Sequence, residues 1–149
     1  MNTFANRVNV FIRADGNAQI GYGHLMRAMA FATHATALTD VVLIIRNPDV
    51  YAFEACEKYS LEYIDVSDVA IENEADYIAE LIRSRSILFV DGYQFDEDYL
   101  RRVSSKGAYQ FAWMTTTIDF FLRAVLSILQ NLKILKILNE VLEPNSFMD

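Results

Sequence analysis

The sequence predicts an α/β protein with a Rossmann-like parallel sheet that carries helices on both faces. Apolar runs of strand length alternate with longer segments of helical period, and the runs are rich in Val, Ile, Leu and aromatic residues. The 149 residues are 53% hydrophobic, which is enough for one buried core. Repeated strand, helix, strand connections imply parallel pairing with right-handed crossovers.

Each element follows from a local pattern. The expected strands are Val8–Ile12, Val41–Ile45, Leu61–Val66, Ile87–Val90 and Ala108–Trp113. Amphipathic spacing predicts helices over Gly23–Leu38, Asp49–Tyr59, Asn73–Arg83 and Asp96–Ser104. Before the second of these helices, Asn47 is the expected N-cap and Pro48 the first helical residue.

Residues 115–149 have a different pattern, so we divide the chain into a domain at 1–114 and a helical tail. Polar side chains recur there at steps of three or four and form one stripe: Arg123, Ser127, Gln130, Lys133, Lys136, Glu140 and Glu143. We expect a long amphipathic helix over Ile118–Leu142. Its broad apolar face would pack on the domain or on a partner, a second copy included.

Composition excludes several classes of protein. A net charge of −7 and a pI near 4.8 argue against a nucleic-acid partner, although a local site can still bind an anionic small molecule. Cys56 is the only cysteine, so neither a disulfide nor a cysteine metal cluster is expected. Charged residues interrupt the apolar tail and no signal peptide is evident, which predicts a cytoplasmic protein without a membrane span.

The stretch RADGNAQIGYGHLMRAMAFA follows the first expected strand directly. Its three glycines, Gly16, Gly21 and Gly23, fall in the turn where a helix should begin. In doubly wound folds such a turn lets the backbone approach a phosphate at the helix N-terminus. Arg13 and Asp15 come at the end of the strand, where side chains point into the ligand crevice.

The dinucleotide-binding fingerprint is incomplete. Gly21-Tyr22-Gly23 supplies its first two glycines, but Met26 occupies the third position, and the second strand is followed by Arg46 where an acidic residue would bind the ribose. Arg46 would favour NADP over NAD. A small nicotinamide oxidoreductase is therefore a weaker interpretation, and we expect no cofactor.

His24 and Asp91 are candidates for acid–base chemistry. The positive end of a helix dipole favours the neutral form of His24, whose basic nitrogen could activate water. Asp91 ends the fourth strand and should point toward the same crevice as Asp15 and His24. The alternatives are that His24 only packs or caps and that Asp91 caps the next turn. We interpret His34 as structural.

These residues form a recognisable motif. Arg13-Ala14-Asp15, Ile20-Gly21-Tyr22-Gly23-His24 and Met26-Arg27 together resemble the R-x-D…I-G-x-G-H-x-x-R signature of the nucleotide-sugar hydrolases of pseudaminic acid biosynthesis, which related spore-coat polysaccharide proteins share. Val90-Asp91-Gly92-Tyr93 resembles that family's apolar strand closing in Asp-His-Tyr, with Gly92 in place of the histidine. The resemblance runs from about Val8 to Trp113.

The resemblance implies the N-terminal, sugar-facing half of a GT-B-like fold. Members of this family hydrolyse UDP-2,4-diacetamido-2,4,6-trideoxy-β-L-altropyranose at the anomeric carbon and release UDP without a metal. His24 matches their proposed water-activating base, and Gly21 and Gly23 match the loop that lets substrate close on the helix start. The remaining expected substrate-binding residues are Arg13, Asp15, Tyr22, Arg27, Asp91 and Tyr93.

The chain also departs from the family pattern. A second Rossmann-like domain, which the resemblance implies for binding UDP, is not among the 149 residues, so we expect a truncated member with impaired turnover. The family's Asp-Asp pair soon after the last strand is missing beyond Trp113, and we hypothesise that the tail from Thr115 is a frameshifted translation. Sequencing the locus tests this, because restoring the frame should give a family-like continuation. The alternative function is a non-catalytic domain that binds a nucleotide sugar or a partner.

Overall fold

A computed structural model describes residues 9–37, 39–82, 86–106 and 109–113. All of them belong to the first of two compact units of the chain, Met1–Met114. The second unit, Thr115–Asp149, with the predicted helix over Ile118–Leu142, lies outside the described residues.

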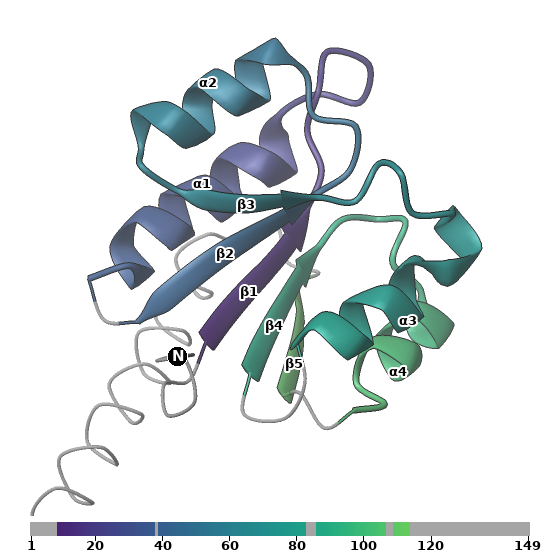
Figure 1. The fold of residues 1–149 in the computed structure, drawn as a ribbon. Helices are drawn as coiled ribbons and strands as arrows, with labels where there is room; N and C mark the ends of the chain where they lie inside the picture. Colours follow the sequence, from purple (N-terminus) through teal and green to yellow (C-terminus); the bar gives the residue numbers. More distant parts are fainter. Residues whose placement is uncertain (1–8, 38, 83–85, 107–108, 114–149) are drawn as a thin grey trace, which may run out of the picture. The chain divides into compact units, whose positions relative to one another are not determined.

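Strands and helices alternate along the described chain. The strands are β1 (Asn9–Ala14), β2 (Asp40–Ile45), β3 (Glu62–Asp65), β4 (Ser86–Asp91) and β5 (Tyr109–Trp113), and the helices are α1 (Gly23–Ala35), α2 (Val50–Lys58), α3 (Ile71–Ile82) and α4 (Glu97–Val103). The strands form one parallel sheet in the order β3-β2-β1-β4-β5 (Figure 1). The predicted α/β class and parallel sheet are confirmed. None of the described helices is long and apolar enough to cross a bilayer.

Alternate side chains of the central strands serve two separate cores. Phe11 in β1 packs with Ile44 and Leu88 in a cluster that α3 and α4 complete on one face of the sheet. Ile12 pairs with Phe89, whose ring contacts Phe31 of α1 at a centroid distance of 5.0 Å. Ile12 therefore faces α1, and Figure 1 shows α1 and α2 together on the side opposite α3 and α4.

The start of α2 corrects one prediction. Its N-cap is Asp49, whose side chain accepts a hydrogen bond from the Ala52 amide at 3.1 Å, and not Asn47. Asn47 has a φ of 49°, in the left-handed region that Asn tolerates better than most L residues. Because this residue turns the chain out of the sheet, helical geometry begins only after Pro48.

The two central strands extend further than their apolar runs predict. β1 continues to Ala14, and β4 ends at Asp91, its pairing partner. The sequence pattern ended at Ile12 and Val90 because charged residues follow. In the structure, those charged side chains are buried with partners of opposite charge, so the ladder continues through them.

Candidate functional site

The carboxyl ends of β1 and β4 are adjacent at the centre of the sheet. From β1 the chain runs to α1 on one face, and from β4 it runs to α4 on the other (Figure 1). Ligands of doubly wound sheets bind at such a switch point. The predicted site residues come from these two loops and the helix that follows β1.

His24 and Asp91 meet at this point. His24 lies in the first turn of α1, Asp91 is the last residue of β4, and His24 Nδ1 is 2.8 Å from Asp91 Oδ1. The Asp91 side chain is fully buried, whereas that of His24 is 28% exposed. The structure thus forms the expected His/Asp pair and leaves part of the imidazole open to solvent.

Arg27 binds the same carboxylate through two bonds. Its Nε donates to Asp91 Oδ2 at 2.9 Å and its Nη2 to Oδ1 at 2.5 Å. An ionised carboxylate only accepts hydrogen bonds, so the short contact with His24 requires a proton on Nδ1. His24 Nδ1 has a second neighbour, Arg27 Nη2, but that contact is longer, at 3.2 Å. We therefore infer that the hydrogen bond of Nδ1 is the one to Asp91 and that Nδ1 carries the proton. In the neutral ring, Nε2 is then the basic nitrogen.

Tyr93 borders the imidazole from the loop after β4. Its ring meets the His24 ring edge-on at a centroid distance of 5.0 Å, and the residue is 93% exposed. An exposed aromatic ring beside a partly exposed imidazole provides an apolar surface for a sugar or base ring.

Gly92 stands where the motif Asp-His-Tyr has its histidine, and a side chain at this position would meet its neighbours. A Cβ at this position would lie 2.5 Å from Gln94 Oε1 and 2.8 Å from Phe95 Cε2. A histidine at position 92 would therefore require both side chains to move. In this chain, the Gln94 carboxamide occupies that space and donates to Asp15 Oδ2 at 3.0 Å.

Two glycines of the first loop are required by the backbone. Gly21 has a φ of 83°, which L side chains rarely adopt. A Cβ on Gly16 would lie 2.5 Å from Leu25 Cβ, so Gly16 permits close approach to α1. Gly23 differs, because a Cβ there would have no atom within 4 Å outside its immediate chain neighbourhood, and the space beside the start of α1 is open on that side.

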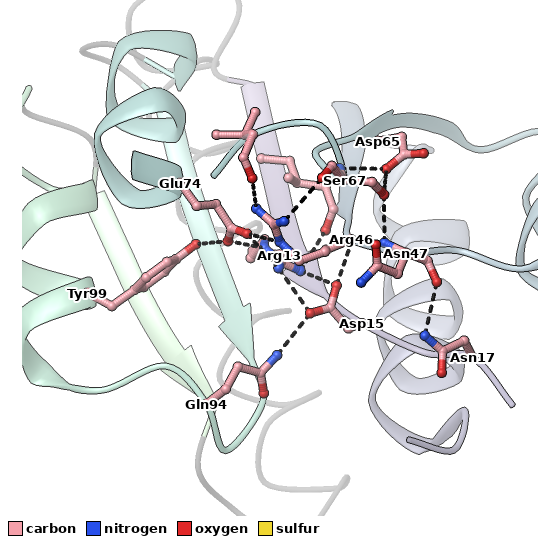
Figure 2. A network of polar contacts seen from close by, with 12 residues as sticks. Arg13, Asp15, Asn17, Arg46, Asn47, Asp65, Ser67, Glu74, Gln94 and Tyr99 are labelled. Carbon is pink, nitrogen blue, oxygen red and sulfur yellow. Dashed lines mark hydrogen bonds and ion pairs between the residues drawn. The ribbon is translucent and has the colours of Figure 1, made fainter. Parts of the chain in front are cut away.

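Arg13 and Asp15 belong to a second, separate network on the α3 side of the sheet (Figure 2). Arg13 Nε donates to Glu74 Oε1 at 2.8 Å and its Nη2 to Asp15 Oδ2 at 3.0 Å. Asp15 also accepts from the Arg46 amide at 2.7 Å. We expected Asp15 beside His24. The alternation of β1 instead sends Arg13 toward α3, whereas Asp91, paired with Ala14, faces α1.

Electrostatics keep Glu74 and Arg13 of this network ionised. Burial raises the pKa of Glu74, but hydrogen bonds and attraction from Arg13, with help from Arg46 and Tyr99, outweigh it and hold the pKa below its ordinary value. For Arg13 the signs are reversed. Burial lowers the pKa of the guanidinium, but its bonds to Asp15 and Glu74 raise the pKa above the ordinary value. The Arg13 side chain is 1% exposed, so its guanidinium contacts these carboxylates and not solvent.

Arg46 also takes part in this network. Its Nε donates to Glu74 Oε2 at 2.6 Å and its Nη2 to the Val69 carbonyl at 2.6 Å. These contacts direct the guanidinium toward α3 and the loop before it. That orientation weakens the nicotinamide interpretation, in which Arg46 would bind a ribose phosphate.

Glu74 was not predicted as a site residue, although the sequence carried a signal for it. Glu74 lies four and eight positions before Ile78 and Ile82, so it shares the apolar stripe of α3. An acidic residue on such a stripe must be paired when the helix is buried. Asp49 was missed as well, because the cap was predicted at Asn47 and Asp49 was expected only as a residue of the helix.

Metal ligands are not grouped in the described part of the chain. Among those residues, no three His, Cys, Asp or Glu side chains lie close enough together to hold a metal ion.

Comparison of the chain with protein-family models, with curated proteins and with solved structures gives no match in any of the three.

Proposed function

We propose that this chain is a nucleotide-sugar hydrolase that releases UDP from a UDP-diacetamido-trideoxy hexose by attack of water at the anomeric carbon. The observation that carries the proposal is the His24–Asp91 pair, 2.8 Å apart, at the start of a helix that follows a glycine-rich loop. We further propose that residues 1–114 correspond to the N-terminal half of a GT-B-like fold, that the protein is cytoplasmic, and that Ile118–Leu142 supports association with a partner or a second copy.

The proposed chemistry needs one base. His24 Nε2 accepts a proton from water as the water oxygen bonds to the anomeric carbon. The bond from that carbon to the phosphate oxygen breaks, and UDP leaves with the electron pair. Asp91 holds the Nδ1 proton and stabilises the imidazolium that forms. Arg27 keeps Asp91 in place through its two bonds.

Substrate binding is proposed for the backbone around the start of α1. The amides of the first turn and the open space beside Gly23 suit a pyrophosphate or sugar hydroxyls. Tyr22 and Tyr93 would line the sugar, and Gly21 gives the loop its shape. Arg13 and Asp15 would contribute indirectly, by holding the strand ends and the Gln94 side chain in place.

The open space beside Gly23 and the exposed ring of Tyr93 also suit a second candidate, binding without turnover. Both features can hold a nucleotide sugar without His24 acting as a base. The protein would then be a nucleotide-sugar-binding domain.

UDP release from the diacetamido-trideoxy nucleotide sugar separates these functions. His24→Ala should reduce turnover by about 10²- to 10⁴-fold, the usual contribution of a general base. His34→Ala is the matched control, since His34 is the only other histidine and its Nδ1 is bonded to the Ala30 carbonyl on the same helix. Binding of the sugar nucleotide by folded protein without any release of UDP would exclude the hydrolase and favour the binding domain.

A further inference from the structure

Asp49 does more than cap α2. Its Oδ1 accepts from the Ala52 amide at 3.1 Å, which is the capping bond. Its Oδ2 accepts from the Ala18 amide at 2.9 Å and from the Tyr22 hydroxyl at 2.5 Å. One carboxylate therefore joins the start of α2 to the loop between β1 and α1.

That loop is closed on itself and tied to the same segment a second time. Asn17 Oδ1 accepts from the amides of Gln19 at 2.9 Å and Ile20 at 3.2 Å, and the Gly21 amide donates to the Asn17 carbonyl at 2.9 Å. Asn17 Nδ2 also donates to the Asn47 carbonyl, 3.0 Å away. Figure 2 shows this bond as a dashed line. The loop therefore has a defined shape before any ligand binds.

Tyr22 connects this loop to the candidate base. It is the N-cap residue of α1, two positions before His24, and its carbonyl accepts from the Met26 amide at 2.8 Å. The Tyr22 side chain makes no capping bond to its own helix. Its hydroxyl binds Asp49, and its ring contacts Tyr51 at a centroid distance of 4.7 Å. The first turn of α1 is thus held from α2.

The hydrogen bond between Tyr22 and Asp49 has a fixed donor and acceptor near neutral pH. The hydrogen bond to Asp49 raises the pKa of Tyr22 to about 12, and the same bond lowers the pKa of Asp49. The hydroxyl is therefore the donor and the carboxylate the acceptor throughout the neutral range.

We propose that Asp49 is a positioning residue, which acts through the Tyr22 hydroxyl and the Ala18 amide to hold the first turn of α1 where His24 meets Asp91. Its effect on turnover rests on the proposed hydrolase function, whereas its effect on the His24 imidazole does not. A capping role alone would leave His24 unaffected by any replacement that keeps the α2 cap.

Two variants test this. Asp49→Ser retains a good capping oxygen for the Ala52 amide but cannot also reach Ala18 and Tyr22. Tyr22→Phe removes only the hydroxyl. Asp96→Ser is the matched control, because Asp96 caps α4 in the same way by accepting from the Tyr99 amide at 2.8 Å.

The primary readout is the ring ¹⁵N resonances of His24, with those of His34 as the internal reference. We expect Asp49→Ser and Tyr22→Phe to shift the His24 signals and leave those of His34 in place, and Asp96→Ser to shift neither. Unchanged His24 resonances in folded Tyr22→Phe and Asp49→Ser proteins would overturn the proposal. If Asp49→Ser does not fold, Tyr22→Phe decides alone.

Turnover gives the second readout. In both variants kcat for UDP release should fall by about 10- to 100-fold, because a misplaced base affects the chemical step. KM should change little, since Tyr22→Phe keeps the ring that is proposed to line the sugar. Full kcat in a variant whose His24 signals have moved would overturn the catalytic importance of the positioning. Absence of UDP release from the wild-type protein, with the His24 signals still dependent on Asp49, would contradict the proposed function and leave the positioning role intact.

Discussion

His24 Nδ1 lies 2.8 Å from Asp91 Oδ1, although 67 positions separate the two residues in the chain. The contact exists because β4 pairs directly with β1, so the end of β4 faces the helix that follows β1. Arg27, three residues after His24 and hence on the same helix face, reaches the same carboxylate. A single buried side chain therefore orients two side chains of α1.

Asp91→Asn should reduce UDP release by about 10²- to 10⁴-fold, because an amide no longer selects the tautomer with the proton on Nδ1. It should also destabilise the fold by about 2 kcal/mol, since Arg27 loses its charged acceptor. Steady-state kinetics and urea unfolding measure the two effects. Unimpaired turnover in folded Asp91→Asn protein would contradict the tautomer that we infer.

Arg13→Met should destabilise the domain by about 3–5 kcal/mol, because it leaves the buried carboxylates of Asp15 and Glu74 without their main partner. Arg102→Met is the matched control. Arg102 pairs with Asp76 at the surface, at 2.7 Å, where solvent screens the interaction. If urea unfolding showed that the two variants lose equal free energies of unfolding, Arg13 would not be a central element of the fold.

The order of elements could be predicted because the strands are continuous apolar runs. The ends of β1 and β4 could not, since Arg13 and Asp91 interrupt the apolar pattern and only their tertiary partners make burial possible. The preference of Asn for helix caps favoured Asn47 as the N-cap of α2. In the structure Asn47 has a left-handed backbone conformation in the turn after β2, and the N-cap is Asp49.

The site could be predicted in part. His24 at the helix start and Asp91 at the strand end were both expected at the edge of the sheet where the strands end, and they meet there because β4 pairs with β1. The separation of Asp15 from His24 was not foreseeable from the sequence alone, because it depends on the pairing of Ala14 with Asp91, which fixes the face to which each side chain points.

Acid should weaken the domain through Glu74. Although burial alone raises its pKa, Arg13 outweighs that effect and holds the pKa below the ordinary value of 4.5. A carboxylate with a lower pKa in the folded state stabilises the fold above its unfolded value and loses this contribution as the pH falls through its folded value. The free energy of unfolding should therefore decline below about pH 4.5.

Glu74→Gln tests the source of that decline, because it should lower stability at neutral pH and flatten the acid limb. Glu80→Gln on the same helix, where the carboxylate pairs with Lys106 at the surface, should change the profile less. Urea unfolding at a series of pH values gives both curves. An acid limb as steep in Glu74→Gln as in the wild type would assign the decline to other groups.

Gly21 and Gly23 should respond differently to replacement by alanine. Gly21→Ala places a side chain at a φ of 83° and should cost about 1 kcal/mol of stability. Gly23→Ala lies at the start of α1, with open space around the added methyl group, so stability should be unchanged or rise by a few tenths of a kcal/mol.

If substrate occupies the space beside Gly23, the methyl group of Gly23→Ala should raise KM for the nucleotide sugar. Thermal unfolding and kinetics of both variants distinguish a backbone requirement at Gly21 from a ligand requirement at Gly23. A Gly23→Ala protein with wild-type KM would place the substrate elsewhere, because a ligand bound at the helix start would contact the added methyl group.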